Sequence, residues 1–168
     1  MEGHRGSVGG TGYRARMGAI EDRLDALGIE LPEPFPPAGN YLACTRAGDQ
    51  LFVGGHGPIA GTRTIIGKVG TDLTLEQGRE AARMTACSLL ATMQQELGTL
   101  DRVRRIVKVF GMVNVGGTFN RMPEVIDGCS DLFVEVFGNA GRHTRSAVGM
   151  AALPFDIAVE VELVALVD

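Results

Sequence analysis

The strongest periodic pattern in the chain lies between residues 75 and 97, where apolar side chains recur every three or four positions. This spacing predicts an α-helix that turns one face toward a core. Thr74 and Gln77 have the types and the separation of a capping box at its start, and Gly98 is placed to end it. The residues expected to face the core are Ala82, Ala86, Leu89, Leu90, Met93 and Leu97.

A second long helix is predicted over residues 123–137, with Pro123 in its first turn and Gly138 as its stop. A shorter helical pattern covers residues 20–27, and the proline-rich segment 32–37 after it is expected to be extended. The core face of the long helix is expected to consist of Val125, Cys129, Leu132, Phe133 and Val136.

The remaining apolar segments predict β-strands. Residues 41–46 and 50–54 have the pattern of a hairpin, and residues 103–115 form a long strand. Two C-terminal strands follow, over residues 144–149 and 159–162. From the hairpin onward the order is ββαβαββ. This order predicts an α+β fold in which the two long helices pack on one face of a mixed sheet.

The long strand is apolar on both of its sides. Simple alternation places Val107, Val109, Val113 and Val115 on one face and Ile106, Phe110 and Met112 on the other. The two long helices cover only one face of the sheet, and no third helix is available for the other. We therefore predict that the sheets of different subunits pack against each other.

The length of 168 residues predicts a single domain over residues 17–168, after a glycine-rich and disordered extension over residues 1–16. The formal net charge of −4 gives no general attraction to nucleic acid or to an anionic membrane. No apolar run reaches the roughly 18 residues of a membrane-spanning helix. Cys44, Cys87 and Cys129 are widely spaced and odd in number, which favours reduced thiols in a cytoplasmic protein and no metal site.

Arg145 is the most informative single residue. In an extended segment it shares a face with Ala147 and Gly149, so small neighbours leave room around its guanidinium. A planar guanidinium in such a site binds a small carboxylate or phosphate through two hydrogen bonds. The alternative is a surface arginine whose structural partner is Glu160 or Glu162 of the next strand.

These motifs resemble the YjgF/RidA family of reactive intermediate deaminases, once called endoribonuclease L-PSP. The resemblance extends from Asn40 to Asp168 and is most specific at Arg145-Ser146, Leu153-Pro154 and Val159-Glu160. The stretch from Ser130 to Gly149 looks like that of a longer-chained and poorly characterised branch of the family. The resemblance implies a chorismate-mutase-like fold and a homotrimer with ligand clefts at the subunit boundaries. It also implies hydrolysis of enamines and imines, such as 2-aminoacrylate and 2-iminopropionate, to a 2-keto acid and ammonia without cofactor or metal.

The resemblance also implies the roles of individual residues. Arg145 matches the arginine that binds the substrate carboxylate, and Glu160 matches the acid that places or activates water. Tyr41, at the start of the first strand, matches the tyrosine that is expected to be catalytic by closing the pocket or sharing its hydroxyl, and Gly55 matches the glycine whose backbone lines the pocket. Backbone near Ala147 completes it.

Three positions depart from the family pattern. Gly54 replaces a common serine, Ala147 replaces a cysteine, and Asp127 corresponds to an asparagine or threonine within the second long helix. An ionised Asp127 that faced the cleft would repel a carboxylate substrate. The alternative function is therefore a trimer that binds a small metabolite in the same cleft without turnover.

Other polar residues are weaker candidates for a functional role. His56, in a glycine-rich turn with exposed backbone, and His143, two residues before Arg145, are candidates for proton transfer or simply solvated loop histidines. The local basic run consists of Arg102, Arg104, Arg105 and Lys108. Because no aromatic residues alternate with it, we expect a solvated edge and no nucleic-acid partner.

Overall fold

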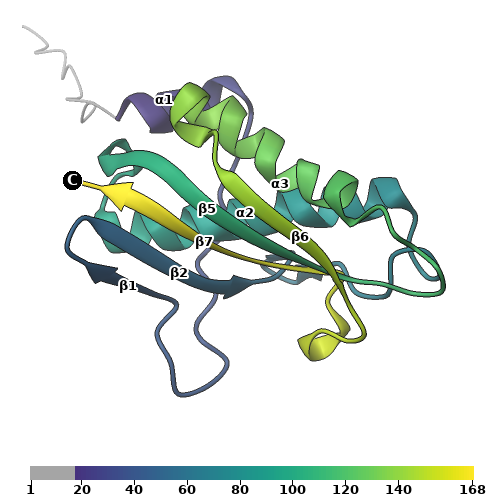
Figure 1. The fold of residues 1–168 in the computed structure, drawn as a ribbon. Coiled ribbons are helices and arrows are strands. Elements are labelled where there is room, and N and C mark those ends of the chain that lie inside the picture. The colour runs from purple at the N-terminus through teal and green to yellow at the C-terminus, as the bar shows by residue number, and fades with distance from the viewer. Residues whose placement is uncertain (1–17) are drawn as a thin grey trace, which may run out of the picture.

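The computed structural model describes residues 18–168, so the predicted extension over residues 1–16 lies outside the described residues. A five-stranded sheet carries two long helices on one face (Figure 1). The helices are α1 (Ala19–Ala26), α2 (Leu75–Leu97) and α3 (Met122–Phe137). The sheet contains β1 (Cys44–Ala47), β2 (Gln50–His56), β5 (Val103–Asn114), β6 (Thr144–Met150) and β7 (Val159–Val167).

The strands lie in the order β1-β2-β7-β5-β6. The pair β5–β6 is parallel, whereas the other three neighbouring pairs are antiparallel, so the sheet is mixed. Two short strands, β3 (Ile59–Ala60) and β4 (Arg63–Thr64), form a separate hairpin before α2. The predicted α+β architecture with α2 and α3 on one face is confirmed.

The helix ends follow the predicted local chemistry. The Thr74 hydroxyl accepts a hydrogen bond from the Gln77 N–H at 3.2 Å, and the Gln77 side chain accepts one from the Thr74 N–H at 2.8 Å. Gly98 and Gly138 end α2 and α3 with positive φ values of 80° and 60°, which glycine adopts without steric cost. All residues expected on the core faces of both helices are buried.

Glycines allow the layers to approach closely. A Cβ atom at Gly128 of α3 would overlap the backbone carbonyl of Arg79 in α2, so the two helices touch through their main chains at this point. A Cβ atom at Gly111 of β5 would lie 2.6 Å from Cδ1 of Ile126, which fixes α3 directly against the sheet. These two contacts set the position of α3 over β5 and β6.

One predicted face assignment in β5, that of Ile106, is wrong. Ile106 and Val109 are both fully buried, although simple alternation places them on opposite sides of the strand. The pairing of β5 with β7 shifts between Ile106 and Lys108, and such a β-bulge adds a residue that reverses the alternation. Phe110 and Met112 follow the prediction and lie half-buried on the face away from the helices.

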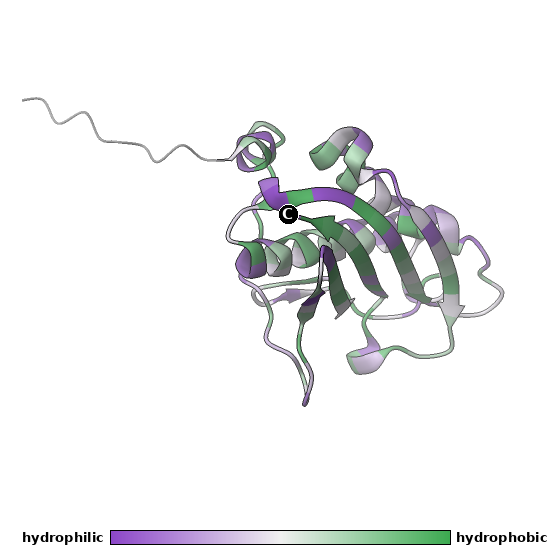
Figure 2. Ribbon diagram, turned by 60° about the vertical axis from the view of Figure 1, so that its left-hand side comes forward, coloured by the Kyte–Doolittle hydropathy of each residue, from purple (hydrophilic) through white to green (hydrophobic). Residues whose placement is uncertain are grey.

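That second face is largely apolar. In β7, buried residues alternate with more exposed ones, and Figure 2 shows hydrophobic bands along the strands. Phe52 is 40% exposed there and borders a hollow of about 190 Å³ with Phe110, Val164, Lys108 and Glu162. No helix of residues 18–168 covers this face, because α1 packs against α3. Its coverage by another subunit remains a prediction.

The helix contact at Gly128 gives a stability test. Gly128→Ala is expected to lower the free energy of unfolding by about 1–3 kcal/mol, because the new methyl group meets main-chain atoms that cannot move independently. Gly78→Ala is the matched control in α2, since its Cβ atom meets only methyl groups of Val69 and Val125 at 3.1–3.3 Å. Both substitutions gain about 1 kcal/mol of helix propensity, which therefore cancels in the comparison. Urea unfolding would contradict the assignment if both variants lost equal stability.

Candidate functional site

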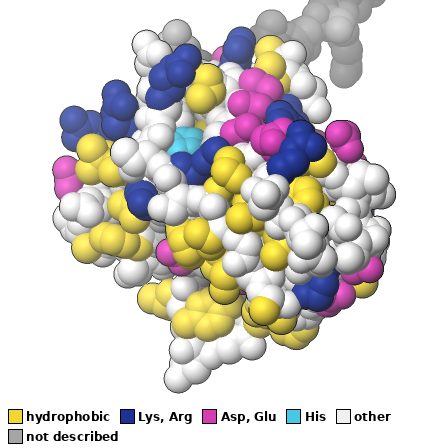
Figure 3. All heavy atoms as spheres, turned by 45° about the vertical axis from the view of Figure 1, so that its right-hand side comes forward, with side chains coloured by type: hydrophobic (Ala, Val, Ile, Leu, Met, Phe, Trp, Pro, Cys, Tyr) yellow, Lys and Arg dark blue, Asp and Glu magenta, His cyan; other side chains and the backbone are white. Residues whose placement is uncertain are grey.

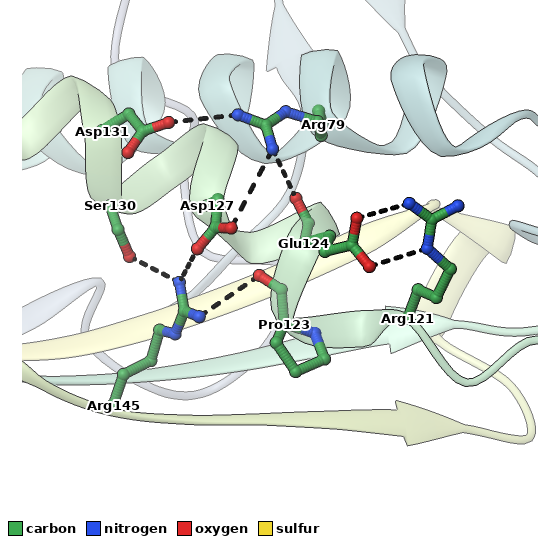
Figure 4. A network of polar contacts seen from close by, with 8 residues as sticks. All are labelled: Arg79, Arg121, Pro123, Glu124, Asp127, Ser130, Asp131 and Arg145. Atoms are coloured by element: carbon green, nitrogen blue, oxygen red, sulfur yellow. Dashed lines mark hydrogen bonds and ion pairs between the residues drawn. The ribbon is translucent and has the colours of Figure 1, made fainter.

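Arg145 lies on the edge strand β6 and points toward α3. It pairs in register with Val109 of β5, and both side chains therefore face the helix layer. Its Nη1 donates to Oδ1 of Asp127 at 2.8 Å and to Oγ of Ser130 at 2.9 Å, and its Nη2 donates to the Pro123 carbonyl at 3.2 Å (Figure 4). The prediction that Glu160 or Glu162 is its structural partner is wrong, because Asp127 occupies that position.

Asp127 lies between two guanidinium groups. Its Oδ2 is 3.9 Å from Nη1 of Arg79, which comes from α2. Arg79 is held in turn by the Glu124 carbonyl at 3.2 Å and by Oδ2 of Asp131 at 3.1 Å (Figure 4). The two arginines and the two aspartates balance in charge. Because Arg79 sits beside the helix contact at Gly128, the packing of α2 on α3 assembles this cluster.

Ser130 and His143 extend the contacts of Arg145. Nδ1 of His143 lies 2.6 Å from the Gly141 carbonyl, and Nε2 lies 3.0 Å from Oγ of Ser130. A carbonyl only accepts, so Nδ1 carries the proton and Nε2 accepts from the Ser130 hydroxyl. Burial lowers the pKa of His143, the Gly141 hydrogen bond opposes this, and the positive charge of Arg145 lowers it further. His143 thus reaches the site through Ser130 and fixes its hydroxyl.

Ser130 was not among the predicted site residues. Its position three residues after Asp127 places both side chains on one face of α3, which was the available signal.

Glu160 lies on the opposite face of the sheet. It pairs with Met112 and belongs to the half-exposed side of β7, away from α2 and α3. A Cβ atom at Gly55 would overlap Oε1 of Glu160, so the carboxylate lies directly over this glycine. Burial raises the pKa of Glu160, and the negative charge of Glu162 adds to the effect.

Tyr41 does not open the first strand, as the prediction had it. β1 begins at Cys44, and Tyr41 lies in the preceding loop with 54% of its surface exposed. Its hydroxyl accepts a hydrogen bond from the Ala38 N–H at 3.1 Å. The Gly54 N–H donates to the Ala43 carbonyl at 2.9 Å, which brings this loop next to the end of β2.

The structure thus divides the predicted residues into two groups. The helix-side group contains Arg145 and Asp127, with Ala147 packed nearby against the core. The outer-face group contains Gly55 and Glu160. The sheet separates Arg145 from Glu160, so one chain alone does not bring them together.

His56 is a core residue, which corrects its interpretation as a solvated residue in an exposed turn. It is 9% exposed, with Nδ1 2.8 Å from the Gly54 carbonyl and Nε2 2.7 Å from Oγ1 of Thr92 in α2. Burial lowers its pKa, and the hydrogen bond to Gly54 partly opposes the shift. The sequence pattern failed because a register shift in β2 turns this ring toward the helices.

No group of three or more metal-ligating side chains occurs within residues 18–168. The three cysteines are free, and burial raises the pKa of the Cys129 thiol, so it is no nucleophile. In Figure 3, acidic and basic side chains lie next to one another in the upper part of the surface, with hydrophobic groups beside and below them. None of the helices in the described part has the length and apolar composition that a membrane crossing requires.

Comparison with known proteins gives a family and close structural relatives. The family model "YjgF/chorismate mutase-like, putative endoribonuclease" matches residues 21–167. Protein TCP17 of Trypanosoma cruzi is 44% identical over 149 residues, which cover 86% of this chain and 92% of that protein. The crystal structure of Atu1372, a protein of unknown function from Agrobacterium tumefaciens, has a TM-score of 0.83 at 37% identity, covering 89% of this chain and 92% of that one.

A more distant structure, Escherichia coli TdcF with bound serine, has a TM-score of 0.58 at 22% identity. It covers 83% of this chain and 98% of that one. At this identity the likeness supports the fold alone.

The lowered pKa of His56 predicts a pH-dependent stability. Below pH 6.5, the ordinary pKa of histidine, the ring of His56 takes up a proton in the unfolded chain but stays neutral in the folded one. The free energy of unfolding therefore falls as the pH falls. The expected slope is up to about 1.4 kcal/mol per pH unit. Urea unfolding between pH 7.5 and 5.5 should give a shallower slope for His56→Gln. Equal slopes in the wild type and His56→Gln would contradict the assignment to His56. The raised pKa of Glu160 changes the stability in the opposite sense, but it does so in both proteins and therefore cancels in the comparison.

The contact between Gly55 and Glu160 gives a second test. Gly55→Ala is expected to push the Glu160 carboxylate toward solvent and to lower its pKa toward the ordinary value, because hydration favours the charged form. The pH titration of the Glu160 carboxyl carbon by NMR measures this. Gly54→Ala is the control, since its Cβ atom would lie 3.5 Å from the Ala43 carbonyl, an ordinary contact. An unchanged titration in Gly55→Ala would refute the contact.

Proposed function

The chain belongs to the YjgF/chorismate mutase-like family, and on that premise we propose that it hydrolyses small carboxylated enamines and imines to a 2-keto acid and ammonia. The observation that carries the proposal is the state of Arg145. Its side chain is only 21% exposed at the sheet edge, and within residues 18–168 its Nε makes no hydrogen bond. The Nε side of the guanidinium is therefore available to a ligand carboxylate.

The proposed site requires a second copy of the chain. Arg145 and Glu160 lie on opposite faces of one sheet, so a cleft that contains both must draw them from two subunits. The apolar second face, with Phe52 at 40% exposure, supports an assembly in which that face is covered. A homotrimer with three such clefts is the assembly that the family resemblance implies.

The reaction needs few catalytic groups, because a protonated imine is already electrophilic. Arg145 holds the carboxylate, and positioning of this kind contributes several kcal/mol. Glu160 of the neighbouring copy orients the attacking water and accepts its proton. Its raised pKa brings it closer to neutrality, where a general base is most effective. The Gly55 backbone and Tyr41 line the same side of the cleft.

Atoms and charge balance without a cofactor. The water oxygen bonds to the imine carbon, and both water protons pass to the nitrogen, one of them through Glu160. The carbon–nitrogen bond then breaks, and the products are the keto acid and an ammonium ion.

The endoribonuclease activity in the description of the family is not part of the proposal. In the basic run at the start of β5, Arg102 donates to the Leu97 carbonyl at 3.1 Å and to the Asp168 carbonyl at 2.5 Å. Arg104 lies 3.5 Å from the Asp168 carboxylate. These arginines are engaged at the end of the chain, which supports a structural role for the run.

A trimer that binds a metabolite without turnover is the second candidate. Ala147 and Gly54 lack the thiol and the hydroxyl that the family pattern has at these positions, and both losses remove polar contacts to a reacting ligand. The retained arginine would still bind a carboxylate in this case.

Ammonia release from freshly generated 2-aminoacrylate tests the proposal. We expect the wild type to exceed the spontaneous rate, Arg145→Ala to lose nearly all of the acceleration, and Glu160→Gln to lose about 10²-fold. Arg104→Ala is the control, because it removes a surface arginine at the far end of β5.

Size-exclusion chromatography with light scattering shows whether each variant keeps its assembly. No acceleration by the assembled wild type with any imine would contradict turnover and favour the binding protein. A monomeric wild type would contradict the two-subunit cleft.

A further inference from the structure

We infer that Asp127 makes this site selective for ligands that carry a cationic nitrogen beside the carboxylate, and against keto acids. The inference rests on the proposed role of Arg145 as the carboxylate-binding residue. It follows from the contact between Asp127 and Arg145, whereas the sequence alone indicated only that an ionised Asp127 would repel a carboxylate.

The charged groups of the site already balance one another. Asp127 already neutralises Arg145 at 2.8 Å, and Arg79 is balanced by Asp131 at 3.1 Å. The nearby carboxylate of Glu124 forms an ion pair with Arg121, so these two charges also balance. A ligand with a single carboxylate therefore adds an uncompensated negative charge next to Asp127. A ligand with a carboxylate and an ammonium or iminium group adds none.

The hydrogen bonds of Arg145 leave its Nε for a ligand. Asp127 and Ser130 accept from Nη1 and the Pro123 carbonyl accepts from Nη2, whereas no group of residues 18–168 accepts from Nε. A ligand carboxylate at the Nε side leaves Asp127 in place, because Arg79, 3.9 Å from its other oxygen, also attracts it. In a 2-amino or 2-imino acid the nitrogen is separated from the carboxylate by one carbon. Because Asp127 binds Nη1 and the ligand carboxylate binds at Nε, Asp127 acts on this nitrogen through its charge and not through a direct contact.

The charge of Asp127 also affects the substrate and the product of the proposed reaction differently. The protonated imine is the electrophilic form, and a nearby carboxylate favours protonation of its nitrogen. The keto acid product has lost this nitrogen and presents a carbonyl oxygen to Asp127 instead. The same residue therefore attracts the substrate and weakens the binding of the product, which promotes product release.

Calorimetric titration with L-alanine and pyruvate tests the inference, because the two ligands share a carbon skeleton and differ at the nitrogen. The wild type is expected to bind L-alanine more tightly. Asp127→Asn keeps an oxygen acceptor for Arg145 but removes the charge, and should shift the affinity ratio toward pyruvate by about tenfold or more. Asp131→Asn is the matched control: it removes the same charge one helical turn away and contacts Arg79, not Arg145.

The outcomes separate this inference from the proposed function. A ratio that is unchanged in Asp127→Asn, or changed equally in Asp131→Asn, overturns the role of Asp127 and leaves the carboxylate site standing. Failure of every variant to bind either ligand overturns the carboxylate site and the inference together. Thermal unfolding of each variant identifies a loss of binding that comes from a loss of fold.

Discussion

The close contact of α2 and α3 at Gly128 is the constraint on which the candidate site depends. No side chain fits between the Gly128 main chain and the Arg79 carbonyl, so the two helices have one available distance and register. Gly111 imposes the same condition between α3 and β5 through Ile126. Together they place Asp127 over the β6 edge and Arg79 beside it. The charged cluster is therefore a consequence of main-chain packing and not of flexible surface pairing.

The ion pair between Arg145 and Asp127 adds little to stability by itself. Its side chains are 21% and 40% exposed, and pairs that water reaches typically contribute about 1 kcal/mol or less. Its value lies in preorganisation: Ser130 and the Pro123 carbonyl hold the guanidinium in one orientation while its Nε side stays open. A rigid, partly neutralised arginine discriminates between ligands of different net charge more sharply than a free one.

The sheet gives the molecule two different faces. The helix side is a closed core, whereas the other side combines half-buried apolar residues with Glu160 over Gly55. A carboxylate in such surroundings is held partly out of water, which is the cause of its raised pKa. An apolar face and a partly desolvated acid are both explained by a second copy that covers them. The proposed cleft and the proposed assembly therefore depend on the same surface.

Local sequence patterns were enough to predict both long helices, their caps and the order of helices and strands along the chain, because these follow from periodicity and from contacts a few residues apart. They did not predict the order of the strands within the sheet or the edge position of Arg145. Tertiary structure alone decided the burial of His56, the faces of Ile106 and Val109, and the choice of Asp127 over Glu160 as the arginine's partner. Bulges in β2 and β5 caused the first two of these, the burial of His56 and the faces of Ile106 and Val109. Each bulge reverses the alternation of side chains, and the local sequence pattern does not show where a bulge occurs. The third depended on the register of α3 over β6, which main-chain contacts between distant segments set.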